Sequence, residues 1–305
     1  MGGIGVVLSI PEDLSYVRDE RYMIVERATE RTYANTTGEG RGNFGAISLP
    51  NYAVAVDSSM YPSVAKEFRT YIERTTRTPV TKLILTHCHG DHVFGNQIFK
   101  DCQIISSRAL ATRMSEVAAS QWTHQKLEEA AKMRPDSYGN IDLNSLEITF
   151  PTVVFDESFT LTDEEFKIVV KKAGGHTVDS SYVHFPAERV LFTGDLIFAQ
   201  TFPWGGDPTA DPDEWITVLK ELQQKDIEKI VPGHGPICDL KEIQKYLDFF
   251  EPVSEIMKEL IAEGRTLEEV VGFDDYPEFY ASETPERRRD TLAHWYQVYK
   301  AEFVK

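Results

Sequence analysis

Thr86-His87-Cys88-His89-Gly90-Asp91-His92 is the stretch around which the rest of this chain is organised. The apolar run at residues 80–85 before it predicts a buried strand, and residues 93–99 after it predict the start of a helix. Three of the eight histidines of the chain fall within this stretch. Imidazole and carboxylate groups bind zinc and similar transition metals. The stretch therefore predicts a metal site at a strand-to-helix turn, and the alternative is a polar loop with coincidental histidines.

The spacing within the stretch favours two groups of ligands. His87 and His89 are two residues apart at the extended end of a strand, so we expect both side chains to point the same way. Gly90 allows the chain to turn sharply after them. Asp91 and His92 can then face the first pair across a gap wide enough for a second metal.

Further ligand-type residues occur later in the chain, each after an apolar run and a glycine. They are His176, Asp195 and His234, which follow the strand-like residues 166–171, 190–192 and 227–231. Glycine lets the backbone approach a metal or substrate closely. Because side chains at one end of a set of strands can converge, we expect these residues to meet the first stretch.

These blocks, with Val54-Ala55-Val56-Asp57 before them, resemble the metallo-β-lactamase-fold superfamily of metal-dependent hydrolases over residues 20–240. The alternation of strands and helices by itself predicts only an α/β fold. The resemblance implies more: a four-layer αβ/βα sandwich of two mixed β-sheets flanked by helices, with the metals at one edge. We also expect a helical C-terminal extension, which divides the chain into a metal-binding hydrolase domain at 1–240 and helices at 241–305.

The resemblance also implies a role for each ligand-type residue. His87, His89 and His176 would hold a first metal, Asp91, His92 and His234 a second, and Asp195 would bridge the two. We expect two divalent ions, with Zn²⁺ favoured and iron or manganese left open, because such sites accept several metals. Asp91 is the candidate catalytic residue, which would orient the attacking hydroxide or pass its proton to the leaving group. Asp57 would be buried near the site, although a helix cap is an equal alternative.

The function implied by the resemblance is hydrolysis. A hydroxide bridging two metals would attack an ester, thioester, lactone or amide-type bond of a small molecule. Some β-lactamase subclasses have other residue types at the positions of His92 and Asp195. This difference favours the glyoxalase II-like and lactonase-like branches of the superfamily. The alternatives are a persulfide dioxygenase with one iron, which shares the His-x-His-x-Asp-His block, and a true β-lactamase. A binding protein with an inactive site is a weaker alternative.

Aromatic residues follow Asp195 on a loop rich in glycine and proline. Phe202 and Trp204 could form an apolar wall for an acyl or aromatic group, and simple loop packing is an equal alternative. The other histidines, His124, His184 and His294, are not expected to be ligands.

The charge, the apolar runs and the cysteines of the chain exclude several classes of partner and location, which leaves a small-molecule substrate. The formal net charge of −17 over 305 residues disfavours nucleic acid, and the short run Arg287-Arg288-Arg289 lies between acidic residues. No apolar run approaches the length of a membrane span. Three cysteines and a start without a basic region at residues 1–10 favour the cytoplasm over secretion.

The remaining predictions concern secondary structure at the two ends of the chain and in an insertion between them. Residues 240–305 predict helices only, and Trp295, Tyr296 and Tyr299 on the last helix would serve as core or as contacts of a homodimer. Residues 22–26, 45–49 and 52–56 predict short antiparallel strands, and residues 114–146 predict a mostly helical insertion.

Overall fold

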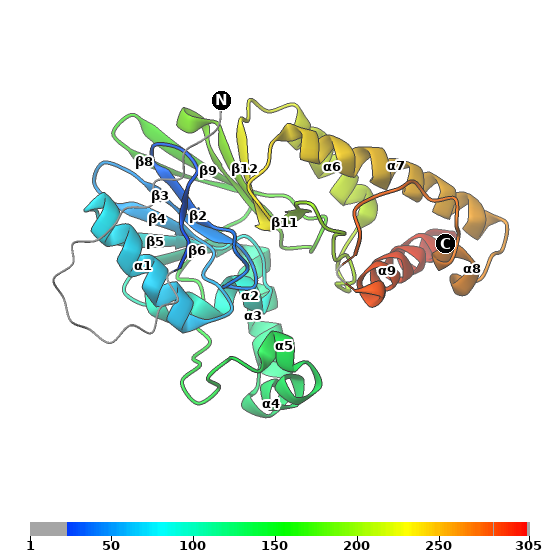
Figure 1. Ribbon diagram of the computed structural model, residues 1–305, viewed down its shortest axis with the longest axis horizontal. Helices are drawn as coiled ribbons and strands as arrows, with labels where there is room; N and C mark the ends of the chain where they lie inside the picture. Colours follow the sequence, from blue (N-terminus) through cyan, green and yellow to red (C-terminus); the bar gives the residue numbers. More distant parts are fainter. Residues whose placement is uncertain (1–22, 283, 304–305) are drawn as a thin grey trace.

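Two β-sheets lie face to face in the computed structural model, which describes residues 23–282 and 284–303 (Figure 1). Helices cover the outer face of each sheet, and further helices extend from one end of the molecule. This arrangement confirms the predicted sandwich of two mixed sheets with C-terminal helices. The expectation about residues 1–10 lies outside the described residues.

The first sheet has seven strands in sequential order. Neighbours from β1 to β4 pair antiparallel, whereas those from β4 to β7 pair parallel, so the sheet is mixed. Its strands are β1 (Glu26–Arg27), β2 (Thr32–Asn35), β3 (Phe44–Ser48), β4 (Ala53–Val56), β5 (Val80–Ile84), β6 (Gln103–Ser107) and β7 (Val153–Phe155). The expected strand at 22–26 is wrong in extent, because among its described residues, 23–26, only Glu26 belongs to β1. In addition, β2 lies in a stretch where no strand was expected.

The second sheet has five strands in the order β12-β11-β10-β9-β8. Only β11 and β12 pair parallel. The strands are β8 (Ser158–Asp163), β9 (Phe166–Lys172), β10 (Ser181–Phe185), β11 (Val190–Phe198) and β12 (Lys229–His234). Alternate side chains such as Val54, Ile84, Ile168 and Val183 are fully buried and pack between the two sheets.

The helices fall into two groups along the chain. Those before β7 are α1 (Pro62–Thr76), α2 (Gly90–Val93), the 3₁₀ helix η1 (Phe94–Phe99), α3 (Arg108–Ser120), α4 (His124–Met133) and α5 (Pro135–Tyr138). The later ones are η2 (Pro186–Glu188), α6 (Pro212–Gln223), α7 (Leu240–Ala262), α8 (Leu267–Val271) and α9 (Pro285–Phe303). The expected helical insertion is confirmed by α3 to α5. None of the helices within the described residues is long and apolar enough to cross a membrane.

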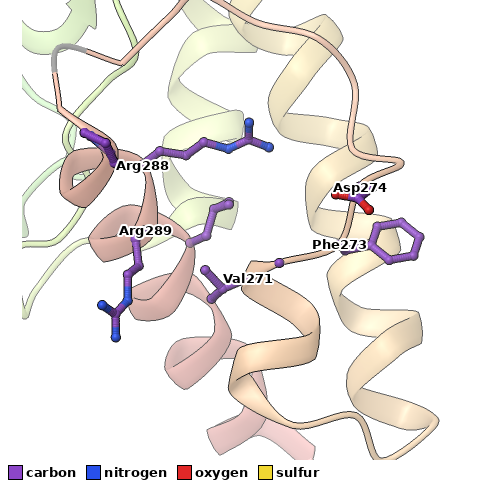
Figure 2. Close-up of a pocket in the computed structure, with 8 residues that line it drawn as sticks. Val271, Phe273, Asp274, Arg288 and Arg289 are labelled. Carbon is purple, nitrogen blue, oxygen red and sulfur yellow. The ribbon is translucent and has the colours of Figure 1, made fainter.

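The C-terminal helices share one apolar core with the second sheet. Leu191 of β11, Trp215 of α6, Phe250 of α7 and Trp295 of α9 belong to a single buried cluster. A pocket of about 310 Å³ opens between α8 and the start of α9 (Figure 2). None of the seven candidate ligands lines this pocket. The division of the chain at residue 240 and the expected homodimer stay predictions.

Candidate metal centre

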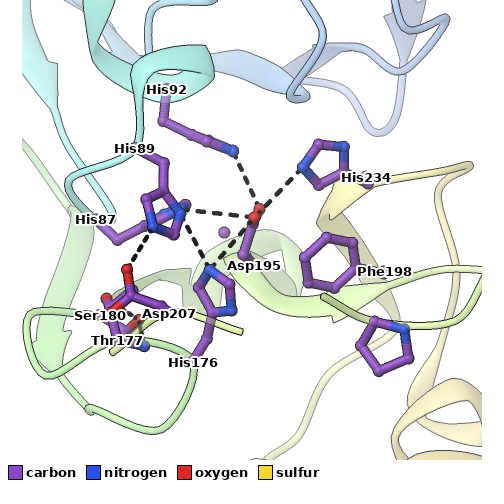
Figure 3. Close-up of polar contacts among 12 residues, drawn as sticks. His87, His89, His92, His176, Thr177, Ser180, Asp195, Phe198, Asp207 and His234 are labelled. Carbon is purple, nitrogen blue, oxygen red and sulfur yellow. Dashed lines mark hydrogen bonds and ion pairs between the residues drawn. The ribbon is translucent and has the colours of Figure 1, made fainter. Parts of the chain in front are cut away.

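The structure brings all seven candidate ligands to one edge of the sandwich, where strands of both sheets end. His87 and His89 follow β5, and α2 carries Asp91 and His92. His176 lies between β9 and β10, Asp195 lies within β11, and His234 ends β12. The convergence expected from the strand exits is therefore present. Figure 3 shows that four histidines are directed at Asp195.

The first group consists of three histidines whose inner ring nitrogens nearly touch. Nδ1 of His89 lies 3.0 Å from Nε2 of His87 and 3.2 Å from Nε2 of His176. Oδ2 of Asp195 lies 3.6 Å from Nε2 of His87 and 3.5 Å from Nε2 of His176. These four donor atoms lie close enough to bind one metal ion.

The second group consists of Asp91, His92 and His234. Oδ2 of Asp91 lies 3.4 Å from Nε2 of His234 and 3.8 Å from Nε2 of His92. Asp195 joins this group to the first, because its carboxylate oxygens lie 3.0 Å from Nε2 of His92 and 3.3 Å from Nε2 of His234. Asp195 therefore contacts histidines of both groups.

Outer partners determine which nitrogen of each histidine faces inward. Nε2 of His89 lies 2.9 Å from Oδ2 of Asp207, and Nδ1 of His92 lies 2.9 Å from Oδ2 of Asp57. A carboxylate accepts a hydrogen bond, so each of these nitrogens carries the proton. The opposite nitrogens, Nδ1 of His89 and Nε2 of His92, then present lone pairs to the centre, as a metal ligand requires.

Asp57 holds several parts of the centre together. Besides His92, its carboxylate accepts hydrogen bonds from the backbone N–H and the hydroxyl of Thr86, both at 2.8 Å. Because the Thr86 hydroxyl donates to Asp57, it can accept from Nδ1 of His87, which lies 3.1 Å away. Asp57 has a left-handed backbone (φ 59°), and α1 begins later, after Tyr61. The helix-cap alternative for Asp57 is therefore wrong.

The electrostatics of the cluster favour neutral histidines in the first group. Burial lowers the pKa of His87 well below its ordinary value, and the neighbouring His92 adds to this effect. Burial likewise lowers the pKa of His176 to about 3. Imidazole must be neutral to bind a metal, so both rings are in the required state at neutral pH.

The second group creates a place for a cation. Burial lowers the pKa of His92, but the carboxylates of Asp195, Asp91 and Asp57 outweigh it and raise that pKa well above its ordinary value. Nε2 of His92 and Oδ1 of Asp195 are buried and make no hydrogen bond. Buried polar atoms normally have partners, and these two atoms face each other at 3.0 Å. The three carboxylates around His92 thus favour a positive charge at this point, and a metal cation bound to the neutral ring would supply that charge in place of the proton.

Comparison with known proteins agrees with this geometry. Residues 37–234, well over half of the chain, match the metallo-beta-lactamase superfamily. The chain belongs to the metallo-beta-lactamase superfamily. Its branch within the superfamily is not resolved by the comparisons.

Relatives of this superfamily member include two curated proteins. The Beta-lactamase-like protein 2 homolog of Caenorhabditis elegans is 24% identical over 68% of this chain, which spans only 59% of that relative's length. The Metallo-beta-lactamase type 2 of Bacillus cereus is 25% identical over 65% of this chain and 68% of that protein.

Solved structures show the same fold. A metallo-beta-lactamase from Pontibacter korlensis covers 75% of this chain and 99% of its own, with a TM-score of 0.59 and 21% identity. The sec-alkylsulfatase Pisa1 from Pseudomonas sp. covers 90% of this chain and 50% of its own, with a TM-score of 0.71 and 14% identity.

Around the seven candidate ligands of this superfamily member lies a network of charged side chains that the sequence did not indicate. Asp207 forms an ion pair with Arg113 of α3, and Arg113 reaches Asp179 at 2.7 Å. Asp179 in turn accepts the backbone N–H of Cys88 at 2.7 Å. Asp207 and Asp179 are buried, so these contacts fix the histidine stretch from outside. The only available signal was the position of Asp207 directly after Gly205 and Gly206, and an Asp in such a loop is common.

The two aromatic residues expected to form a wall lie in different surroundings. The indole of Trp204 lies 5.4 Å from the ring of His89 and 6.0 Å from that of His176, measured between centroids. Phe202 is buried and packs against Phe249 and Phe279, so the expected place for it in the wall is wrong. The Phe202 ring turns away because an apolar core lies beneath its loop.

The other three histidines, His124, His184 and His294, lie outside the cluster, in keeping with the prediction that they are not ligands. His124 is exposed and pairs with Glu128, and His184 lies within β10. His294 of α9 contacts the backbone carbonyl of Ala210.

Proposed function

We propose that this chain is a metal-dependent hydrolase that holds two divalent cations. His87, His89 and His176 would hold the first and Asp91, His92 and His234 the second. The position of Asp195 carries the proposal, because its carboxylate lies within 3.6 Å of four histidines from both groups. A carboxylate between two such groups is what a bridging ligand requires. Zn²⁺ is the favoured metal because the donors are imidazole nitrogens and carboxylate oxygens.

When bound, two metal ions provide an activated water near neutral pH and a Lewis acid for the substrate oxygen. The residues of the chain have complementary tasks. Asp195 is 4% exposed and is held among four imidazoles, so it serves as a fixed ligand. The side chain of Asp91 is 24% exposed, so its carboxylate can be reached from the solvent side. This exposure supports Asp91 as the group that would accept a proton and deliver it to a leaving group.

The substrate we propose is a small molecule with an ester, thioester, lactone or amide-type bond. Histidine and aspartate stand at positions 92 and 195, and this pattern supports a glyoxalase II-like or lactonase-like enzyme. Trp204 beside His89 supports an apolar group next to the bond that is cleaved. We propose the cytoplasm as its location because the chain has few cysteines.

A second candidate is hydrolysis of alkyl sulfate esters. The likeness to the sec-alkylsulfatase extends over 90% of the chain, compared with 75% for the lactamase from Pontibacter korlensis. That likeness concerns the fold alone. A secondary alkyl sulfate is therefore tested in the substrate panel beside the thioester, lactone and carboxylate ester.

The test combines metal analysis with a substrate panel. Protein purified without chelator should contain close to two metal ions per chain and should hydrolyse at least one thioester, lactone or carboxylate ester. A single iron with oxygen consumption on adding a persulfide would instead support the dioxygenase alternative. Turnover confined to β-lactams would support a true β-lactamase.

A further inference from the structure

The loop that joins β11 to α6, residues 199–211, contacts one metal-site histidine twice. Trp204 lies against the ring of His89, with centroids 5.4 Å apart, and Asp207 accepts from its Nε2 at 2.9 Å. The loop also supports the segment that carries His176. The hydroxyl of Thr209 accepts the backbone N–H of Val178, two residues after His176, at 3.1 Å. The conformation of this loop therefore sets both the wall and the orientation of His89.

Helix α9, more than 70 residues further along the chain, holds this loop in place. The hydroxyl of Thr291 accepts the backbone N–H of Gly205 at 2.9 Å and lies 3.2 Å from the carbonyl oxygen of Pro203. One turn later, Nε2 of His294 lies 2.9 Å from the carbonyl oxygen of Ala210. The one proton of the Thr291 hydroxyl has a nearer acceptor in its own helix, the carbonyl oxygen of Arg287 at 2.9 Å, so its firm contact with the loop is the one with the Gly205 N–H. Thr291 is only 1% exposed, so this N–H cannot turn to water instead.

The loop and α9 pack so closely at Gly205 that there is no room for a side chain there. A Cβ atom on Gly205 would lie 2.9 Å from Cγ2 of Thr291 and 3.2 Å from Nε1 of Trp295. Trp295 is fully buried and packs edge-on against Phe250 of α7, so its ring cannot move away to make room. The backbone beside Trp204 is thus pressed directly onto α9.

We propose that α9 is part of the active site: Thr291 is a positioning residue that sets Trp204 and Asp207 against His89. The aromatic wall held in this way accepts an apolar acyl group of the substrate. The acyl-group part rests on the proposed function, whereas the effect on His89 requires only metal binding.

Substituting Thr291 tests the proposal. Thr291→Val keeps the shape of the side chain but leaves the Gly205 N–H without its acceptor, and Thr291→Ser restores the hydroxyl. Thr217→Val is the matched control, because the Thr217 hydroxyl donates to the carbonyl of Asp213 at 2.8 Å, as the Thr291 hydroxyl does to that of Arg287, but Thr217 is exposed. Zinc affinity is measured by competition with a chromophoric chelator, and kcat/KM is measured for the 4-nitrophenyl esters of hexanoate and acetate.

We expect Thr291→Val to weaken zinc binding about three- to tenfold, less than the effect of removing a direct partner of a ligand. The preference for hexanoate over acetate should fall by a similar factor. Thr291→Ser and Thr217→Val should match the unmodified chain in both measurements. If Thr291→Val lowers only the thermal midpoint and leaves zinc affinity and acyl preference unchanged, α9 is a scaffold and the proposal is wrong.

Two further measurements decide the role of Thr291 even if Thr291→Val does not fold or the esters are not substrates. If Thr291→Val does not fold, His294→Leu removes the other contact of α9 with the loop, and the same pair of readouts decides. If neither ester is hydrolysed by the unmodified chain, the proposed function fails for esters, yet the zinc competition still accepts or rejects the positioning role of Thr291.

Discussion

Oδ2 of Asp207 lies 2.9 Å from Nε2 of His89, on the side of the ring opposite to the nitrogen that faces His87 and His176. This contact fixes the tautomer of His89 and links the histidine stretch to a loop more than a hundred residues away. Arg113 neutralises the same carboxylate from α3. The first metal group therefore depends on three separate segments of the chain.

Asp207→Asn should lower metal affinity at the His87/His89/His176 group by about 10- to 100-fold, because a neutral amide holds the imidazole N–H less firmly. Zinc competition measures the change. Asp101→Asn is the control, since Asp101 is an exposed carboxylate that also pairs with an arginine. Equal affinities in both variants would show that Asp207 does not orient His89.

Asp195→Asn should lose about 10²-fold in turnover and part of the second metal, because an amide is a weaker ligand and the spacing of the two groups changes. Steady-state kinetics and elemental analysis measure these effects, and circular dichroism should show that the fold persists. Unchanged turnover with two metals still bound would rule out the bridging role.

Trp295→Ala should destabilise the fold by about 3–5 kcal/mol, because it removes a fully buried indole from the core shared by α7 and α9. Urea unfolding followed by circular dichroism measures the loss. Trp122→Ala, at a half-buried indole that contacts Phe94, should cost less. A smaller loss at Trp295 than at Trp122 would mean that α9 contributes little to the core.

Acid should weaken the contact between α6 and the second sheet. Burial raises the pKa of Glu221, but hydrogen bonds from Lys171, Tyr182 and Lys225 outweigh it and lower that pKa to about 2. The folded pKa lies below the unfolded value of about 4.3, so the carboxylate stabilises the fold above pH 4.3 and this contribution disappears as pH falls towards 2.

Glu221→Gln should therefore be less stable than the unmodified chain at pH 6, and the difference should shrink between pH 4.3 and 2. The midpoint of urea unfolding at several pH values measures this difference. Because the Glu221 side chain is 40% exposed, solvent screens the effect and we expect it to be small. A difference that is constant across this range would contradict the role of the ionised carboxylate.

Much of the centre could be predicted from the sequence because its ligands obey local patterns. His87, His89, Asp91 and His92 stand within six residues, and His176 and His234 each follow a strand-like run and a glycine. Side-chain direction at the end of a strand is set by the backbone alone. The resemblance added the sandwich fold, which the two sheets confirm.

The first strands were less predictable. The stretch at 22–26 is apolar enough to suggest a strand, yet β1 covers only Glu26–Arg27, and β2 follows at Thr32–Asn35. Strand boundaries depend on which neighbour offers backbone partners, and β2 pairs with β3 over its whole length. Local composition does not contain that information.

The sequence by itself determined the kinds of ligand and their order, because imidazole and carboxylate groups at strand ends form a local signal. Only the tertiary structure decided what holds them. Asp207 reaches His89, Phe202 turns into the core while Trp204 stays at the centre, and Thr291 fixes their loop. Each of these contacts joins residues far apart in the chain. Long-range contacts leave no periodic trace in a sequence, because they depend on how whole elements pack.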